Sequence, residues 1–150
     1  MNLDHVAILD FLKGDGAPVK LEANPFIKEL QGELIAADAD AGTVSIAFEP
    51  GPQFLQGLGV IQGGATTAML DFALAFAALV RSPMGTMFGT VSLSVHFMRP
   101  VTPGRWVARG RVVRQGSRMI FADADLVKEG QDSPVASASG VMAISGGPPR

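Results

Sequence analysis

Asp71 is the charged residue in a long apolar run from Ala65 to Val80, which reads ATTAMLDFALAFAALV. A helix that is apolar on all faces has to be buried in a core or in a membrane. A carboxylate in such surroundings is costly unless it is hydrogen-bonded, solvated by a cleft or protonated. The glycine-rich segment from Gln56 to Gly64, just before this run, is typical of a turn that feeds a helix N-terminus and binds a carbonyl group. Together these features predict a catalytic site.

The rest of the chain predicts mainly β-strands around that helix. The helix is expected to end near Arg81, because Ser82-Pro83 follows it. The remaining runs alternate apolar and polar residues with the period of two that half-buried strands have. The predicted strands are Gly32 to Ala37, Thr43 to Phe48, Thr86 to Met98, Arg105 to Arg114, Arg118 to Lys128 and Pro134 to Ile144.

A flat sheet cannot cover the whole circumference of one apolar helix, whereas a strongly curved antiparallel sheet that wraps around it can. The predicted fold class is therefore α+β, with a curved antiparallel sheet wrapped around one long central helix and hairpins at the tight turns. The last predicted strand carries the small residues Ala136, Ala138 and Gly140 on one face, which would let the helix lie close to the sheet.

Composition limits the function further. The 150 residues fit a single domain, and the net charge of −2 argues against nucleic-acid binding, which usually needs a basic surface. The chain has no cysteine and two histidines, so disulfides, thiolate nucleophiles and Cys-based metal sites are excluded and a His-rich metal site is not expected. His5 is expected at the surface, and His96 is expected to be a structural or interface histidine.

Neither the N-terminal segment nor the central helix predicts a membrane protein. The N-terminus, MNLDHVAILDFLKGDG, has early acids and lacks the basic-then-apolar order of a signal peptide, and it predicts a short amphipathic helix at about residues 3–13. The central helix is shorter than the roughly 20 residues that a bilayer requires, and it carries Asp71. A cytoplasmic protein without a membrane span is expected.

The run from Gln56 to Asp71 (Q-x6-GG-x6-D), with the order of elements, resembles the hotdog-fold acyl-CoA thioesterases of the PaaI (phenylacetate degradation) and 4-hydroxybenzoyl-CoA type. The resemblance covers about Asn24 to Ser145. The segments from Thr90 to Pro100 and from Arg114 to Arg118 are also similar to that family. The resemblance implies a single hotdog domain over residues 1–150, with its core at about 24–145.

The resemblance also implies roles for individual residues. Gln56 matches the position of an Asn or Gln that contacts the thioester carbonyl or water. Gly63 matches the helix-start residue whose backbone N–H binds the carbonyl oxygen, and Asp71 matches the Asp or Glu that acts as nucleophile or general base. Thr90 matches the position of a Ser or Thr that orients the attacking water, although an ordinary strand threonine is an equally good interpretation.

Thioester hydrolysis places negative charge on the carbonyl oxygen, which a backbone N–H at a helix N-terminus stabilises. Gly63 and Gly64 would let the substrate approach the backbone closely. Many PaaI-type proteins have His-Gly-Gly where this chain has Gln62-Gly63-Gly64, and Gln62 can donate a hydrogen bond but cannot become cationic.

Three arginines, Arg111, Arg114 and Arg118, gather around the Gln115-Gly116 turn. They are either a solvated hairpin or a site for the phosphates of coenzyme A, for which the planar guanidinium is suited.

The spacing of Gly63 and Asp71 has a further consequence. Eight residues correspond to about 12 Å along one helix, whereas reacting groups must lie about 3 Å from the atoms on which they act. The two groups that act on one thioester should therefore come from different chains, in a twofold homodimer with two equivalent sites. The family implies that such dimers pair further into a homotetramer.

The predicted function is hydrolysis of an acyl-CoA or aryl-CoA thioester to a carboxylic acid and CoA. No metal or other cofactor is expected, because coenzyme A is part of the substrate. Two alternatives stay open: a non-catalytic acyl-CoA binding module, and a hotdog-type enoyl-CoA hydratase, for which His96 would be the available histidine. The sequence leaves open the acyl group and whether Asp71 acts as nucleophile or base.

Overall fold

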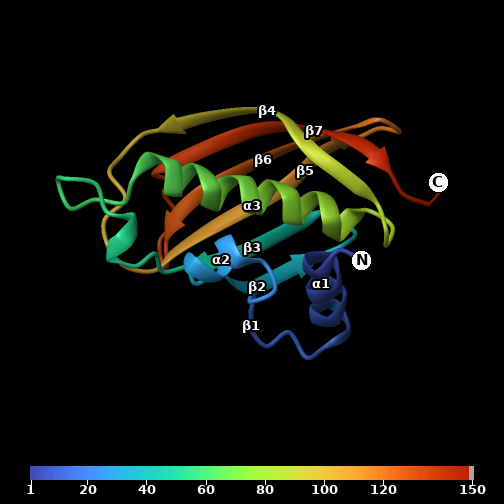
Figure 1. The fold of residues 1–150 in the computed structure, drawn as a ribbon, viewed down its shortest axis with the longest axis horizontal. Helices are drawn as coiled ribbons and strands as arrows, with labels where there is room; N and C mark the ends of the chain where they lie inside the picture. Colours follow the sequence, from blue (N-terminus) through green and yellow to red (C-terminus); the bar gives the residue numbers. More distant parts are fainter. Residues whose placement is uncertain (149–150) are drawn as a thin grey trace.

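The computed structural model describes residues 1–148, and the last two residues of the predicted 1–150 domain lie outside the described residues. Within residues 1–148, one antiparallel sheet curves around the long helix α3, as predicted (Figure 1). The strands lie in the order β1-β2-β3-β5-β6-β7-β4, so β4, the strand that follows α3, forms one edge of the sheet. The elements are α1 (Leu3–Lys13), β1 (Val19–Lys20), α2 (Pro25–Glu29), β2 (Glu33–Asp38), β3 (Thr43–Phe48), the 3-10 helix η1 (Pro52–Phe54), α3 (Gly63–Arg81), β4 (Met87–Phe97), β5 (Trp106–Gln115), β6 (Met119–Lys128) and β7 (Ala136–Gly146).

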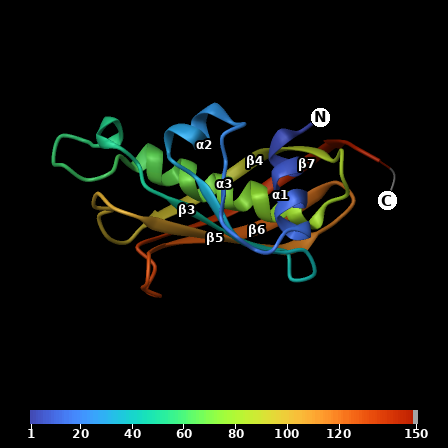
Figure 2. The same ribbon diagram turned by 90° about the horizontal axis from the view of Figure 1, so that it is seen from below.

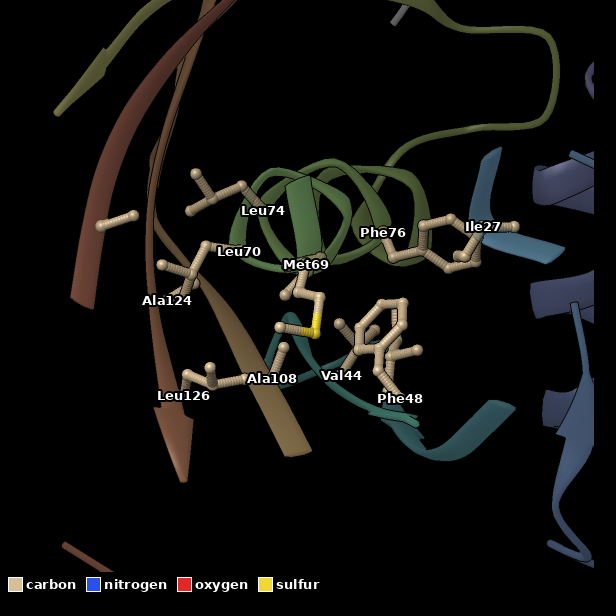
Figure 3. Close-up of a cluster of buried hydrophobic side chains, with 14 of the residues drawn as sticks. Ile27, Val44, Phe48, Met69, Leu70, Leu74, Phe76, Ala108, Ala124 and Leu126 are labelled. Carbon is tan, nitrogen blue, oxygen red and sulfur yellow. The ribbon is translucent and has the colours of Figure 1, made fainter. Parts of the chain in front are cut away.

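Helix α3 supplies the centre of the core. Its Ala, Leu and Met residues have high helix propensity, and the backbone N–H of Ser82 bonds to the carbonyl of Leu79 at its end. Leu70 and Leu74 point toward the strands, and Met69 and Phe76 complete the packing with Phe48 (Figure 3). Burying each such side chain contributes roughly 1.5–3 kcal/mol. By length and composition α3 could cross a membrane, but in this structure it is mostly buried and is the core helix.

Of the two sheet glycines that face α3, Gly110 on β5 lies closer to the helix than Gly140 on β7. A Cβ atom at Gly110 would lie 2.1 Å from the carbonyl oxygen of Ala73, which leaves no room for any side chain. Gly140 on β7 also faces the helix, where a Cβ atom would lie 2.8 Å from a methyl group of Leu74. The small residues of β7 therefore do face α3 as predicted, but the tightest contact involves a glycine that the sequence reasoning did not single out.

The N-terminal helices lie on the side of α3 that faces away from β5 and β6 (Figure 2). Asn2 caps α1 and Asn24 caps α2, each by accepting hydrogen bonds from two backbone N–H groups of the first turn. The expectation that His5 lies at the surface was wrong, because its side chain is 0% exposed, in the face of α1 that also buries Ile8 and Phe11. His5 is buried because it lies on the same face of α1 as Ile8 and Phe11, and this face packs against the core.

The predicted strands agree with β2 to β7 to within two residues at each end. Two elements were not predicted: the two-residue strand β1, which pairs with β2, and η1 in the loop after β3. The residues Pro25–Glu29 form the short helix α2, which Asn24 caps.

Candidate active site

The start of α3 is a tightly bonded turn. Gln62 caps the helix through its side chain, whose Oε1 accepts a hydrogen bond from the backbone N–H of Gly63 at 3.1 Å. The predicted carbonyl-binding donor is therefore occupied by a neighbouring amide in this structure. The backbone N–H groups of Gly64 and Ala65 have no partner within the helix, because the first turn of any α-helix leaves its donors unpaired. A substrate carbonyl at this end would replace Gln62 Oε1 or bind one residue further on.

Gln56 lies in the loop that leads into this turn. Its Oε1 accepts from the backbone N–H of Leu58, and its backbone bonds to Val60 and Gly59 close the loop. The loop is anchored by the N–H of Ile61 on the carbonyl of Val101 at 2.7 Å. With its oxygen engaged, the Gln56 amide presents its NH₂ group as the available donor. The loop lies at the N-terminal end of α3 and projects beyond it (Figure 1).

Asp71 lies near the middle of α3 and is half-buried. The hydroxyl of Thr90, on β4, donates a hydrogen bond to Asp71 Oδ1 at 3.1 Å. The register between β4 and β7 shifts between Thr90 and Ser92, which marks a β-bulge at Val91. Because a bulge lets two consecutive residues oppose one on the next strand, Thr90 faces α3 while Ser92 faces the outside. The structure thus brings together the predicted residues Asp71 and Thr90.

A cavity of about 320 Å³ opens beside this pair. Its floor is a stripe along α3, and its walls are the start of β4 and the N-terminal parts of α1 and α2. Its lining residues are Asn2, Asp4, Asn24, Asp71, Phe72, Ala75, Phe76, Leu79, Thr86, Met87 and Phe88. Asn2, Asp4 and Asn24 are residues that sequence reasoning missed, because they come from elements that precede the recognised motif.

The structure does not bring all predicted residues together. Gly63 and Asp71 lie on one continuous helix, about 12 Å apart along its axis. Arg111 pairs with Asp123 at 3.0 Å, and this pair lines a separate hollow of about 780 Å³ on the sheet. Arg114 and Arg118 are exposed at the β5–β6 hairpin. That hairpin lies near the C-terminal end of α3, because Gln115 Nε2 donates to Ser82 Oγ at 3.2 Å.

The larger hollow is rich in charge, but two of its arginines, Arg109 and Arg111, are already paired with carboxylates, and Arg99 donates to the hydroxyl of Ser133. Arg109 makes two hydrogen bonds to the carboxylate of Asp125 and a third to Asp132, and these bonds raise the pKa of Arg109 above its ordinary value. The cavity beside Asp71 is therefore the better candidate for chemistry. Within residues 1–148, no group of three or more His, Asp or Glu residues is arranged to hold a metal ion.

Comparisons with known proteins agree with this fold and this helix. A sequence model described as the thioesterase superfamily matches residues 58–135, just over half of the chain, which includes α3 and the last five residues before it, 58–62. The chain is 29% identical over 110 residues to a protein of Saccharolobus solfataricus named "Putative esterase SSO2140", covering 69% of this chain and 76% of that protein.

Solved structures of other proteins also resemble this chain over most of its length. A phenylacetic acid degradation-related protein of Ralstonia eutropha JMP134 superposes with a TM-score of 0.78 at 26% identity, over 91% of this chain and 98% of that one. The PaaI protein from the phenylacetic acid degradation operon of E. coli superposes with a TM-score of 0.77 at 22% identity, over 97% and 96% of the two chains. The chain therefore belongs to the thioesterase superfamily, and it is a hotdog-fold hydrolase of thioester bonds.

Proposed function

We propose that the protein hydrolyses acyl-CoA or aryl-CoA thioesters, with Asp71 as general base or nucleophile. The observation that carries this proposal is the Asp71 carboxylate, held by Thr90 at the edge of a cavity of about 320 Å³. Its Oδ1 accepts a hydrogen bond from the hydroxyl of Thr90, which leaves Oδ2 to act on water or on the carbonyl carbon. As a base, Asp71 removes a proton from water, and the water oxygen bonds to the carbonyl carbon. The carbon–sulfur bond then breaks, and the CoA thiolate takes the proton from Asp71 to leave as the free thiol.

The carbonyl oxygen needs hydrogen-bond donors while it carries negative charge. We assign this role to the N-terminal turn of α3, with the N–H groups of Gly63 or Gly64 and the NH₂ group of Gln56. Gln62 would release the Gly63 N–H as substrate binds, since its exposed side chain can turn toward solvent once that hydrogen bond breaks. Asp71 lies about two turns further along the same helix, so both groups act on one thioester only if they come from different subunits.

The open edge of β4 offers a way to build such a dimer. Edge strands usually carry features that prevent pairing, but β4 is eleven residues long and exposes Val91 and Phe97 at 59% and 56%. We propose that two copies pair antiparallel along β4, around a twofold axis. This pairing would continue the sheet from one subunit into the next.

The geometry of β4 favours one register for this pairing. Directly opposed residues of antiparallel strands face the same side of the sheet. A twofold axis at Ser94 sets Leu93 opposite Val95 of the partner subunit and, across the bulge, Thr90 opposite Phe97 of the partner subunit. Phe97 lies against the start of α3, since its ring is 3.6 Å from where a Cβ of Gly63 would be. This register would therefore bring Gly63 of the partner subunit toward the Asp71–Thr90 pair.

The remaining assignments are also proposals. Arg114 and Arg118 are exposed and suited to the phosphates of coenzyme A. Because their hairpin lies near the C-terminal end of α3, they would serve a thioester bound at Asp71 of the partner subunit, whereas Arg111 would first have to leave Asp123. No further cofactor is required by this chemistry. Pairing of dimers into a tetramer and a cytoplasmic location stay predictions of the sequence.

Release of free thiol from acetyl-CoA, octanoyl-CoA and phenylacetyl-CoA tests the function, with wild type beside Asp71→Asn. The amide keeps the shape of the side chain and can still accept from Thr90, but it cannot take a proton from water. We expect kcat/KM to fall about 10²- to 10⁴-fold. Asp10→Asn, an exposed residue of α1 outside the cavity, serves as the matched control and should keep wild-type activity.

Each other result points elsewhere. A folded wild-type protein that binds CoA esters and releases no thiol would be a binding module. Addition of water to an enoyl-CoA without thiol release would identify a hydratase. Thiol release that is equal in wild type and Asp71→Asn would remove Asp71 from the mechanism while leaving the hydrolysis.

A further inference from the structure

The cavity beside Asp71 is a trough whose floor is formed by one face of helix α3. Its α3 residues are Asp71, Phe72, Ala75, Phe76 and Leu79, which follow the i, i+4, i+8 spacing of a single helix face. The trough therefore runs along two turns of α3, or about 12 Å, with Asp71 at one end. Ala75 contributes almost no side chain, which leaves the middle of the trough open.

One long wall of the trough is built by the N-terminal helices. Asn24 Nδ2 donates a hydrogen bond to Asp4 Oδ2 at 3.2 Å, which ties the start of α2 to the first turn of α1. Asn2 caps α1 beside them. A second part of the wall is formed by Thr86, which precedes β4, and by Met87 and Phe88 at the start of β4. This wall of α1 and α2 lies outside residues 58–135, the part of the chain that the superfamily model matches.

The charges in the trough are of one sign. Of the described residues that line it, Asp4 and Asp71 are the ionisable ones, and both are acidic. One oxygen of Asp4 accepts a hydrogen bond from the side-chain amide of Asn24. Two carboxylates in a half-enclosed trough repel anions, including the phosphates of coenzyme A. The CoA part of a thioester bound at Asp71 would therefore lead away from the trough, and its acyl part would enter it.

We propose that this trough is the acyl site and that Asp4 is a specificity determinant that excludes acyl groups ending in a carboxylate. This inference rests on the proposed function. The apolar floor of Phe72, Ala75 and Phe76 contacts the body of an uncharged acyl group. In an acyl group that ends in a carboxylate, that carboxylate would lie within a few ångströms of the Asp4 carboxylate, in a partly desolvated trough. Like charges at such a separation lower the affinity by about tenfold or more.

The test compares acyl-CoA esters that differ only in terminal charge. Pairs of substrates with increasing length are propionyl and malonyl, butyryl and succinyl, pentanoyl and glutaryl, and hexanoyl and adipyl CoA, each measured as kcat/KM for thiol release. Wild type should prefer the uncharged member of each pair, most strongly at the length that brings the terminal carboxylate to Asp4. Asp4→Asn keeps the shape of the side chain and an oxygen for Asn24, and it should raise kcat/KM for that carboxylate substrate about tenfold with little change for its uncharged partner.

Asp10→Asn provides the matched control, because it removes a carboxylate from the same helix at an exposed position outside the trough. It should leave the preference of every substrate pair unchanged, whereas a general effect of net charge would alter both variants equally. If Asp4→Asn hydrolyses uncharged esters normally and its preference equals that of wild type at every length, Asp4 is not a specificity determinant while the proposed function stands. Absence of thiol release from every ester in wild type would instead remove the proposed function itself.

Discussion

Thr90 is a positioning residue in our account, because it acts on the thioester through Asp71. Its hydroxyl holds Asp71 Oδ1 at 3.1 Å, and the bulge at Val91 turns it toward α3. Without this bond the half-buried carboxylate can adopt other rotamers, and its second oxygen loses its fixed direction. We expect Thr90→Val, which keeps the shape of the side chain and removes the hydroxyl, to lower kcat about ten- to a hundredfold, the usual value of a hydrogen bond to a charged group.

Thr90→Ser restores the hydroxyl and should recover most of that loss. Ser92→Ala, two residues along the same strand and facing the outside of the sheet, is the matched control for changes in β4. Steady-state kinetics for one ester separates two possible roles of Thr90, orienting Asp71 and packing in the protein. If Asp71 loses its orientation, kcat falls, whereas a loss of packing raises KM or unfolds the protein. Equal kcat for the Val and Ser variants would show that the hydroxyl does not orient Asp71.

The sequence was informative about residues whose type is unusual for their surroundings. Asp71 stood out because a carboxylate is rare in an apolar helix, and Gly63 and Gly64 stood out by their place before that helix. Asp4 and Asn24 gave no such signal, because surface Asp and Asn residues at helix starts are common caps. Their place in the trough depends on how α1 docks, which is a tertiary contact between distant parts of the chain.

At the scale of elements, helix α1 buries a histidine, His5, which should make the stability of the protein depend on pH. His5 is 0% exposed, and neither ring nitrogen has a hydrogen-bond partner among the described residues. Burial lowers the pKa of His5 below its ordinary value of 6.5, opposed in part by the neighbouring backbone of Ser82. At a pH below about 6.5 the unfolded chain therefore binds a proton that the folded chain excludes. The free energy of unfolding should then fall as the pH falls.

The expected result is a stability that decreases by up to about 1.4 kcal/mol per pH unit below about pH 6.5 owing to His5. His5→Leu replaces the imidazole by an apolar group and should flatten this slope, as measured by urea unfolding at several pH values. Ile8→Val is the matched control on the same helix face, since it should cost about 0.5–1.5 kcal/mol at every pH and keep the wild-type slope. A slope that is identical in wild type and His5→Leu would contradict the role of His5.

Most elements could be predicted because each carries a local pattern. The alternation in Thr43–Phe48 and the apolar length of α3 depend only on neighbouring residues. The strand β1 escaped prediction because two residues are too short to show a period, and it forms only by pairing with β2. The contact of Gly110 with α3 was equally hidden, because it depends on the position of the helix along the sheet.

At the scale of the whole molecule, two surfaces are not fully covered by the rest of the described chain. One is the open edge of β4, with the exposed apolar residues Val91 and Phe97. The other is the stripe of α3 around Asp71, which the sheet does not cover. Both surfaces lie beside the Asp71–Thr90 contact, so a partner bound along β4 would meet the candidate active site. The sequence predicts a second chain from helix geometry, and the order of the sheet, with β4 at one edge, is the reason for proposing β4 as the contact.

The twofold register at Ser94 leads to a covalent test. Directly opposed residues of an antiparallel pair have Cα atoms about 4.5–5.5 Å apart, within the range that a disulfide can bridge. Since the chain contains no cysteine, Ser94→Cys would introduce a single thiol on the outer face of the sheet, facing its own copy across the axis. We expect rapid formation of a covalent dimer under mild oxidation, detected by non-reducing electrophoresis, with thiol-release activity retained because the disulfide fixes the active pairing.

Ser92→Cys is the matched control, because the same register sets residue 92 opposite His96 of the partner subunit. Two copies of residue 92 would then lie four residues apart along the pair, or about 13 Å, which is too far for a disulfide. Cross-linking of the 94 variant alone supports the register and the shared active site that depends on it. Cross-linking of the 92 variant alone would shift the axis by two residues and separate Gly63 of the partner subunit from Asp71. A monomer in solution that hydrolyses thioesters at the full rate would exclude a shared site, since each chain would then supply both the carbonyl donors and the carboxylate.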